Sequence, residues 1–496
     1  MITPLLPTSS AHPVWRREGI RALEACLQAT SATPLMDLAG LATACLALAI
    51  APHARQIWIV TGPGNNGGDG LEAALHLHRW GKSVQVSLLG DPQSLPPDAR
   101  RAWTRAQQAG VSIETGLPAS PPELRAQDLC IDALLGIGAT RAPEGPLLQA
   151  IDWMNACPAT VLAIDIPTGL DADSGQALGA PRTVVRAHHT LTMLGSKPGL
   201  FMGQGRDACG RLWLASLGGD GDAPHASSPD AELNPPAVPA PRWHASHKGS
   251  HGDVAVVGGE SLSARGMGMT GAALLAAQAA LHAGAGRVLL CLLGQDGLAS
   301  ASADLMRRDL DALDLPQLTV VAGCGGGRAI AASLGRLLQH SARLVLDADA
   351  LNCVAQDPWM QRLLTERATR RQTTVLTPHP LEAARLLGLD TAQVQADRLE
   401  AAQQLALRFD CSVALKGSGT VIAAPRQVPR INTTGNGRLA TGGTGDVLAG
   451  LIGARLARDG NGWSATCEAV WTHGQLADCW PQGQALTASR LAEQLT

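Results

Sequence analysis

Short apolar runs alternate with longer amphipathic stretches along most of this chain. Residues 56–60 have the pattern of a buried strand, 71–80 of a helix and 83–89 of a second strand, which together predict a βαβ unit. Further strands are expected at 129–132, 160–165, 190–193 and 211–214. Strands that alternate with helices favour a mainly parallel, doubly wound α/β sheet.

The alternation is interrupted once and then resumes. Between residues 218 and 241, Gly, Asp, Ser and six prolines crowd together without an apolar period, which predicts an exposed linker. We therefore expect one domain at 1–217, a linker at 218–241 and a second domain at 242–496. In the second domain, strands are expected at 253–257, 287–293, 318–322, 344–347, 374–376 and 412–415, and helices at 270–282, 446–458 and 463–479. The halves show no repeat, so two different α/β folds are predicted.

Composition narrows the class of partner. The 496 residues are 45% hydrophobic and 16% charged, which excludes a disordered or coiled-coil protein. With 39 basic and 42 acidic residues the net charge is −3, and no long run of like charge occurs. Tyrosine is absent and only two phenylalanines occur, so the stacking platforms of single-strand binders are missing. We expect a small-molecule partner and no nucleic acid.

The cysteines and the N-terminus bear on the compartment. Eleven cysteines without a single CxxC pair indicate neither a disulfide framework nor a zinc knuckle, and favour a reducing compartment. Residues 1–18 lack the basic and apolar segments of a signal peptide. The longest apolar stretch, near 38–51, is interrupted by Thr43 and is too short to span a bilayer. A cytoplasmic protein without a membrane partner is expected.

Glycine-rich and acidic residues follow several of the predicted strands, where open α/β sheets bind ligands. The segment 61–70, TGPGNNGGDG, lies between a strand and a helix, and its glycines let backbone amides approach a phosphate. Asp132 and Asp165 each end an apolar strand. Such a carboxylate serves as a general base or a cation ligand, or it merely caps the next turn, and the pattern leaves these roles open.

The densest signal in the second half is GNGRLATGGTGD at 435–446, directly before an amphipathic run. Consecutive glycines at a helix start make an anion hole, and Asp446 could act on a hydroxyl held against a phosphate or only cap the helix. A cap does not require so many glycines, which favours function. Upstream, KGSGT at 416–420 offers amides, a hydroxyl and a cation to a nucleotide phosphate, while TPHP at 377–380 and the polar cluster at 347–352 end further strands.

These motifs, taken together, resemble two known families. GPGNNGGDG at 62–70, DALLGIG at 132–138, DIPTGLD at 165–171 and KPGL at 197–200 resemble the NAD(P)HX epimerase family. The motifs from HKGSHGDVAVVGG to GNGRLATGGTGDVLAG are similar to the ribokinase-like, ADP-dependent NAD(P)HX dehydratase. The resemblance covers nearly the whole chain, and this order of motifs is that of the bifunctional nicotinamide-hydrate repair enzymes. It implies a Rossmann-like three-layer domain followed by a ribokinase-like domain.

The resemblance implies an isomerase and a lyase in one chain. Its substrates are NADHX and NADPHX, which are NADH and NADPH hydrated at C6 of the nicotinamide ring. One domain would epimerise the R and S forms, and the other would dehydrate the S form while ADP is converted to AMP and phosphate. The cofactors implied are K⁺ in the first domain and Mg²⁺ in the second, with ADP as co-substrate. A homo-oligomer is expected.

The resemblance also assigns site residues. Asp165 and Asp446 match catalytic residues. The epimerase substrate site matches Asn65, Asn66, Gly67, Gly68, Asp69, Gly136, Ile137, Gly138, Ala139, Thr140, Arg141, Ala142 and Asp165, and the potassium ligands match Asn66, Asp132 and Thr168. The dehydratase substrate site matches Ala272, Gly325, Gly327, His379 and Asp446, and the adenine-nucleotide site matches Lys416, Gly417, Ser418, Gly419, Thr420 and Gly445.

Three segments depart from the family pattern. The substrate loop reads GIGATRA at 136–142, where a leucine often follows the second glycine. At 322–327 the chain has AGCGGG in place of the usual GPGLG, so that Cys324 replaces a proline. The segment 260–267 is longer than usual.

Two other functions fit part of the pattern. A ribokinase-like kinase of a small alcohol would use the GTGD anion hole, but it leaves the NNGGD domain unexplained. A binding or regulatory protein would hold a nucleotide without turnover, and the intact Asp69, Asp132, Asp165 and Asp446 argue against it.

Overall fold

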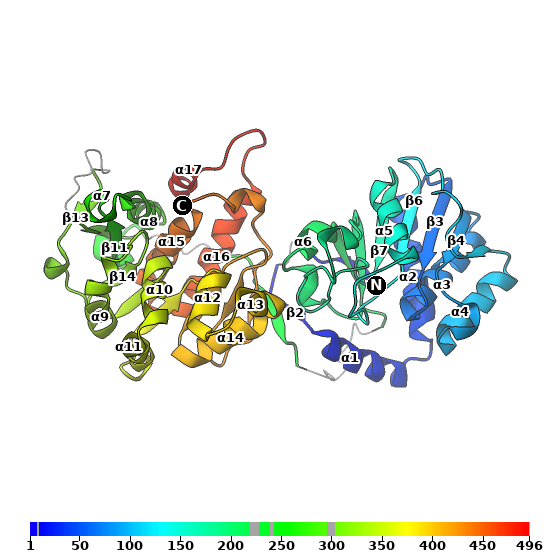
Figure 1. Cartoon of the computed structure of the whole chain (residues 1–496), viewed down its shortest axis with the longest axis horizontal. Helices are drawn as coiled ribbons and strands as arrows, with labels where there is room; N and C mark the ends of the chain where they lie inside the picture. Colours follow the sequence, from blue (N-terminus) through cyan, green and yellow to red (C-terminus); the bar gives the residue numbers. More distant parts are fainter. Residues whose placement is uncertain (7–8, 219–227, 239–242, 295–302, 496) are drawn as a thin grey trace. The chain divides into compact units, whose positions relative to one another are not determined.

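The computed structural model describes residues 1–6, 9–218, 228–238, 243–294 and 303–495. These residues form two compact units (Figure 1). Unit 1 comprises Met1–Thr8 and Pro13–Ala231, and unit 2 comprises Ser9–His12 and Glu232–Thr496. Of the linker expected at 218–241, the parts 219–227 and 239–241 lie outside the described residues.

Unit 1 is built on an eight-stranded sheet that is parallel except for its first strand. In spatial order its strands are β1 (Ile2–Pro4), β9 (Arg211–Ala215), β8 (His189–Met193), β7 (Thr160–Ile164), β6 (Leu129–Ala133), β3 (Gln56–Thr61), β4 (Ser83–Leu88) and β5 (Ser112–Thr115). The order runs outward from β3 in both directions, which confirms the predicted doubly wound architecture. Strand β7 ends one residue before Asp165, whose φ of 67° turns the chain out of the sheet.

Helices cover both faces of this sheet. Helices α2 (Leu35–Ile50), α3 (Asn65–Arg79) and α4 (Pro97–Gln108) share one core with Ile57 and Ile59 of β3. Helix α5 (Pro146–Ala156) packs on the opposite face, against Trp58 and Val60 of the same strand. Successive side chains of a strand point to opposite faces, so a strand covered on both sides is apolar at every position. Helices α1 (Arg17–Thr30) and α6 (Gly205–Ala208) complete the unit.

The glycine-rich segment at 61–70 is helical over its second half, since α3 begins at Asn65 and not near residue 71. A Cβ added to Gly67 would lie 2.1 Å from the carbonyl oxygen of Gly62, and one added to Gly70 would lie 2.5 Å from the Cβ of Ala133. These glycines therefore let the helix pack directly onto the sheet. Glycine has a poor helix propensity, which hid the first turns from the sequence pattern.

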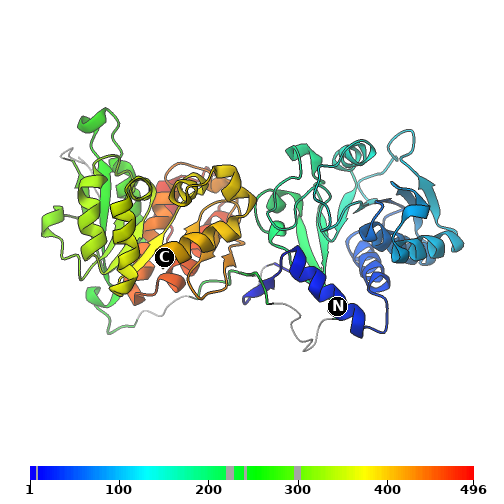
Figure 2. The same ribbon diagram turned by 60° about the horizontal axis from the view of Figure 1, so that its bottom comes forward.

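Unit 2 has an eleven-stranded sheet (Figure 2). In spatial order its strands are β13 (Met306–Arg307), β12 (Arg287–Leu293), β11 (Asp253–Glu260), β14 (Thr319–Ala322), β15 (Arg343–Leu346), β16 (Thr373–Leu376), β17 (Ser412–Leu415), β18 (Val421–Ala423), β19 (Arg430–Ile431), β10 (Ala231–Leu233) and β2 (His12–Val14). The strands from β13 to β17 are parallel, and β18 is antiparallel to both of its neighbours. The resumed α/β alternation predicted from the sequence is confirmed.

Two groups of helices flank the sheet of unit 2. Helices α8 (Thr270–His282), α15 (Thr444–Asp459), α16 (Gly462–Asp478) and α17 (Ala488–Glu493) share one core with alternate residues of the central strands. Helices α9 (Ile330–His340), α10 (Ala348–Gln356), α11 (Pro358–Thr369), α12 (Pro380–Leu387) and α14 (Arg398–Phe409) pack against one another. The short helices are α7 (Leu262–Arg265) and α13 (Thr391–Ala396).

No single helix among the described residues is long and apolar enough to cross a membrane. Helices α1 and α2 meet the length and composition test only when taken together, and the chain bends by 107° between them.

Part of the expected linker is a strand of unit 2. Strand β10 pairs in parallel with β19, and Ala231 and Leu233 are fully buried. The side chain of Asn234 donates hydrogen bonds of 3.0 Å to Asn432 Oδ1 and 2.9 Å to the carbonyl oxygen of Cys467. A domain that began at residue 242 would lack this strand.

We expect a truncated chain that begins at Ser228 to be more stable than one that begins at residue 242. Burying Leu233 alone contributes about 2 kcal/mol, and the shorter chain also loses the hydrogen bonds of Asn234. Urea unfolding followed by circular dichroism should give a lower midpoint for the shorter chain. Equal midpoints would show that β10 adds nothing to unit 2.

Candidate functional site

A cavity of about 510 Å³ lies at the carboxyl ends of the central strands of unit 1. Its wall includes the residues that follow β3, β6, β7 and β8, together with one side of α1 and the start of α2. This is the edge where open α/β sheets bind ligands. Eight of the predicted site residues line it: Asn65, Asn66, Asp69, Gly136, Ile137, Gly138, Ala139 and Asp165.

The other predicted residues of unit 1 lie behind or beside the cavity. Gly67 and Gly68 are buried at the start of α3, and the Gly68 N–H already donates to the carbonyl oxygen of Gly64 at 3.3 Å. Thr140 and Arg141 are exposed and Ala142 is half-buried, and none of the three lines the cavity. The helix start therefore meets the cavity at Gly64, Asn65 and Asn66, and a helix N-terminus favours bound anions.

Sequence reasoning missed three polar cavity residues on α1, namely Arg21, Glu24 and Gln28. Their spacing of three and four residues puts them on one face of the helix. That spacing is a detectable signal, but it is the same signal that a solvated helix face gives. Arg21 adds a positive charge to a cavity that also holds Asp69 and Asp165.

Asp165 contacts Lys197, a buried lysine from the segment after β8. The Lys197 ammonium donates to Asp165 Oδ1, to Thr192 Oγ1 at 2.8 Å and to the carbonyl oxygen of Met193 at 2.8 Å. The backbone N–H of Met193 donates to the same oxygen, Asp165 Oδ1, at 3.3 Å. The KPGL motif contributed to the family resemblance, but no local pattern indicated that its lysine pairs with Asp165.

Asp132 and Thr168 are fully buried and hydrogen-bonded to each other. The Thr168 hydroxyl donates to Asp132 Oδ1 at 2.7 Å, and the Thr168 N–H donates to Oδ2 at 2.8 Å. Burial raises the pKa of Asp132 to about 6, although these hydrogen bonds oppose the rise. Asn66 lines the cavity, and a Cβ at Gly136 would lie 3.3 Å from its Oδ1, so the glycine leaves room for this amide. The structure therefore brings Asp132 and Thr168 into contact and places Asn66 beside the loop that follows β6.

Negative charge accumulates on one side of the cavity. Burial raises the pKa of Asp69 well above its usual value, and the nearby Asp165 and Glu24 raise it further. The pKa of Glu24 is raised by burial and by Asp165, while Lys197 and Arg21 lower it. Three carboxyl groups and Arg21 thus line one cavity, and the buried Lys197 contacts one of the three, Asp165. Such an arrangement is suited to moving a proton.

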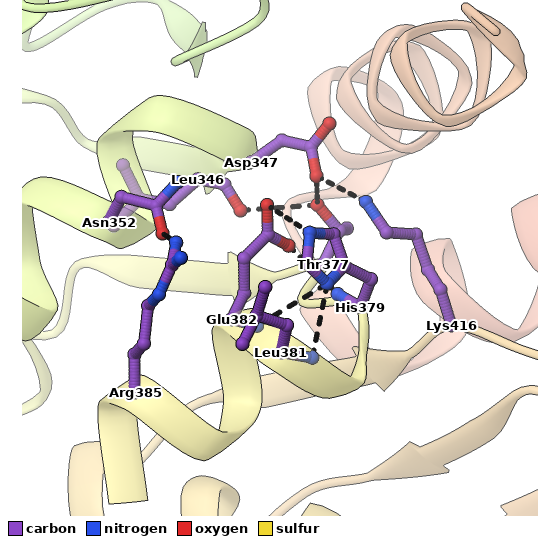
Figure 3. Close-up of polar contacts among 9 residues, drawn as sticks. All are labelled: Leu346, Asp347, Asn352, Thr377, His379, Leu381, Glu382, Arg385 and Lys416. Carbon is purple, nitrogen blue, oxygen red and sulfur yellow. Dashed lines mark hydrogen bonds and ion pairs between the residues drawn. The ribbon is translucent and has the colours of Figure 1, made fainter. Parts of the chain in front are cut away.

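In unit 2, Lys416, Asp347 and Thr377 form a hydrogen-bonded group at the ends of three neighbouring strands (Figure 3). Lys416 Nζ donates to Asp347 Oδ1 at 2.6 Å, and the Thr377 hydroxyl donates to the same oxygen at 2.8 Å. Burial lowers the pKa of Lys416, but Asp347 and Glu382 outweigh it and the pKa is raised overall. Lys416 therefore stays a cation.

Asp446 lies in the first turn of α15, next to this group. Its carboxylate, the Asp347 carboxylate and the Cys324 thiol lie within 4.8 Å of one another and could hold a metal ion. Burial raises the pKa of Asp446 to about 6, and repulsion by Asp347 adds to the rise. A Cβ at Gly445 would lie 3.5 Å from Lys416 Nζ, so the glycine brings the helix start to the lysine.

His379 caps helix α12 and pairs with Glu382 (Figure 3). Its Nδ1 accepts from the N–H groups of Leu381 and Glu382 at 3.2 and 3.3 Å, and its Nε2 lies 3.1 Å from Glu382 Oε1. Burial raises the pKa of Glu382, but its hydrogen bond with His379 and the charge of Lys416 lower it more, so the pKa is depressed overall. Glu382 thus interacts both with His379, a predicted site residue, and with the charge of Lys416. Glu382 itself was not predicted from the sequence.

The glycines of AGCGGG are packed against the start of α8 and against Glu260. A Cβ at Gly325 would lie 2.9 Å from the Cβ of Ala272, which puts these two predicted residues side by side. A Cβ at Gly327 would lie 2.1 Å from the Glu260 carboxylate, and the Gly327 N–H donates to Asp349 Oδ2 at 2.8 Å. Both glycines have positive φ, of 59° and 54°. This loop is therefore held by contacts on both sides despite the replacement of the family's proline by Cys324.

Arg398, a buried residue of α14, supports the segment 416–420 through a hydrogen bond to its backbone. Its guanidinium donates to the carbonyl oxygens of Ser418 at 2.5 Å and Leu415 at 3.1 Å. Gly417, at a φ of 146°, would place a Cβ 2.8 Å from this guanidinium. Gly419 is buried, and the Thr420 hydroxyl donates to the carbonyl oxygen of Gly417 at 3.2 Å. The five predicted residues thus form one fixed turn beside Gly445.

Both halves of the chain match known families. Residues 32–199 match the family described as YjeF-related protein N-terminus, and residues 255–496 match the family described as NAD(P)H-hydrate dehydratase. The chain is 35% identical over 490 residues to the bifunctional NAD(P)H-hydrate repair enzyme Nnr of Escherichia coli K12, an alignment covering 95% of this chain and 90% of that protein. It is 34% identical over 506 residues to the bifunctional NAD(P)H-hydrate repair enzyme of Leishmania braziliensis, with 94% and 89% covered. The solved ADP/ATP-dependent NAD(P)H-hydrate dehydratase of Bacillus subtilis aligns with 52% of this chain and 92% of its own, at 28% identity and a TM-score of 0.43.

Proposed function

Because this chain belongs to the family of bifunctional NAD(P)H-hydrate repair enzymes, we propose that each of its two units performs one step of the repair. Unit 1 interconverts the R and S forms of NADHX and NADPHX. Unit 2 dehydrates the S form and converts ADP to AMP and phosphate. One observation supports this assignment of one step to each unit. Each unit has its own sheet, and a carboxylate lies near the C-terminal ends of that sheet's strands: Asp165 in unit 1 and Asp446 in unit 2.

In unit 1, the N-terminus of α3 binds the phosphates of the dinucleotide through its backbone amides. The loop from Gly136 to Ala142 contacts the substrate through its first four residues, which line the cavity. Asp165 moves a proton on the hydrated ring. Its position inside a cavity of about 510 Å³ supports this role, because a general base must reach the reacting atoms directly.

We assign the potassium site of unit 1 to Asn66, Asp132 and Thr168. A carboxylate, a hydroxyl and a carboxamide supply the oxygen ligands that alkali and alkaline-earth cations prefer. Asp132 is fully buried and its hydrogen bonds come from Thr168 and Leu134, so a neighbouring cation would offset its charge. Bound K⁺ would supply a positive charge next to the buried Asp132.

Replacing potassium by a bulky organic cation such as tetramethylammonium should raise the KM for epimerisation by about tenfold, which corresponds to about 1.4 kcal/mol. The physical reason is that the buried Asp132 then repels the negative dinucleotide without compensation. Thr168→Val, which removes one ligand and keeps the shape, should make the KM insensitive to potassium. Unchanged epimerisation in potassium-free buffer would contradict the ion site.

In unit 2, the turn at 416–420 and the N-terminus of α15 bind ADP. Asp446 orients or deprotonates the C6 hydroxyl, which attacks the terminal phosphoryl group and displaces AMP. The C6–O bond then breaks with loss of phosphate, assisted by the ring nitrogen, and loss of a ring proton restores the double bond. Hydroxide is a poor leaving group and phosphate a good one, which explains why this dehydration consumes a nucleotide.

Lys416 and the helix-start amides stabilise the charge on the transferring phosphoryl group. Ala272, Gly325, Gly327 and His379 form the hydrate site around it. Mg²⁺, bound mainly by the nucleotide phosphates, would be held by Asp347 and would offset the charge of the phosphates. The carboxylate cluster beside Lys416 supports this assignment.

The product stoichiometry tests the proposed function. When the full chain is incubated with prepared hydrate and ADP, one AMP and one phosphate should be released for each NADH or NADPH that is restored. The absorbance of the dihydronicotinamide measures the restoration. A kinase of a small alcohol would instead leave a stable phosphate ester. Restoration without nucleotide cleavage would overturn the mechanism.

A cytoplasmic location and assembly into a homo-oligomer are also part of the proposal. Light scattering during size-exclusion chromatography would measure the molecular mass and so test the assembly.

A further inference from the structure

Lys197 is a fully buried charged side chain that contacts Asp165, a residue of the cavity wall in unit 1. It has no exposed surface, and its ammonium group makes three hydrogen bonds: one to Asp165 and two to the neutral oxygens of Thr192 and Met193. An ammonium group has three donors, so each of them is used. The side chain is therefore fixed in direction as well as in place.

The two oxygens of the Asp165 carboxylate have different surroundings. Oδ1 accepts from Lys197 and from the N–H of Met193. Among the described residues, no protein group donates to Oδ2, and the side chain retains 12% exposure at the cavity wall. One oxygen is thus anchored and the other faces the space where substrate would bind.

The charges around Asp165 make this anchor important. Glu24 on α1 and Asp69 on α3 face the same cavity, and their carboxyl groups are close enough to interact with Asp165. Arg21 is a cation that lines the cavity, and it acts on Glu24. Without Lys197, Asp165 would stand beside two acidic groups in a half-enclosed site, which favours its neutral form.

We propose that Lys197 is a positioning residue for epimerisation, which fixes Oδ1 of Asp165, keeps the carboxylate ionised and leaves Oδ2 free to act as the base. This inference rests on the proposed function of unit 1. It extends that function, because it states which form of Asp165 acts and what maintains that form.

An ionised Asp165 fits epimerisation by ring opening. Oδ2 accepts the proton of the C6 hydroxyl, the C6–O bond becomes a carbonyl, and the C6–N1 bond breaks with its electron pair going to N1. The protonated Asp165 then gives the proton to N1. Ring closure on the opposite face of the carbonyl reverses these transfers and returns Asp165 to its ionised form, so no other reactant is needed.

The test compares pH–rate profiles of full-length variants. Starting from the R epimer, formation of the S epimer is followed by chromatography and corrected for the enzyme-free rate at each pH. Lys197→Met should move the acidic limb of kcat/KM upward by about 1–3 pH units, the usual effect of an opposite charge on a carboxyl group. Lys197→Arg, which keeps the charge, should leave the limb near its wild-type position. If Lys197→Met instead lowers kcat/KM equally at every pH and the acidic limb stays at its wild-type position, Lys197 has only a structural role. That result would overturn the inference.

The rate at which the same variants dehydrate the S epimer shows whether unit 2 is intact. Thermal unfolding shows whether the substitution has destabilised unit 1. If Lys197→Met does not fold, Thr192→Val tests the inference in its place. This substitution removes one of the oxygens that accept a hydrogen bond from the Lys197 ammonium group, and it leaves every charge unchanged. It should lower epimerisation about tenfold with an unmoved limb, and a wild-type rate would overturn the inference. Failure of the proposed function is distinguishable, since only then would Asp165→Asn retain epimerisation.

Discussion

Asp446→Asn should bind ADP nearly as well as the wild type and lose dehydration by about 10²-fold or more, the scale of a lost general base. ADP binding survives because the amides at the start of α15 and the turn at 416–420 remain. Turnover falls because an asparagine cannot accept the proton of the C6 hydroxyl. Steady-state rates with saturating S epimer, together with calorimetric titration of ADP, measure the two effects.

The matched control for this prediction is Asp459→Asn at the opposite end of the same helix, where the carboxylate pairs with Arg458 and accepts from the N–H of Asn461. It makes the same chemical change on α15 and should leave both activities unchanged. Wild-type turnover in Asp446→Asn would remove this residue from the mechanism, and a parallel loss of ADP binding would assign it to binding.

Asp165→Asn should abolish epimerisation, with a loss of about 10²- to 10⁴-fold, and spare dehydration. Asparagine tolerates the positive φ of this position, so the backbone can stay as it is. The variant leaves the buried Lys197 without its carboxylate, and breaking such a pair costs about 3–5 kcal/mol of stability. Epimerisation must therefore be measured well below the unfolding temperature of unit 1.

Two comparisons separate chemistry from folding in this variant. Asp207→Asn changes an exposed carboxylate of α6 in the same unit and should behave as wild type. The dehydration rate of the same chain should also be unchanged, since Asp446 and Lys416 belong to the other compact unit. An Asp165→Asn chain that is folded and still epimerises would refute the role of Asp165 as the base.

The predicted elements and motifs are largely those of the structure, because they depend on local patterns. Helix α8 and strand β12 have the predicted bounds, and the other predicted strands agree within a few residues. Where the prediction differs, a tertiary contact outweighs a local preference. Helix α3 begins at glycine-rich residues because Gly67 and Gly70 fit against the sheet, and β10 forms in a proline-rich segment because Ala231 and Leu233 are buried beside β19.

By itself the sequence determined the alternation of strands and helices, the two α/β units and the acidic and glycine-rich residues at the strand ends. It did not determine which of these residues meet. Asp165 and Lys197 are 32 positions apart and come together because β7 and β8 are neighbours in the sheet. Hydrophobic periodicity reports which residues are buried, whereas the partners of a buried charge depend on strand order, and only the tertiary structure decided that order.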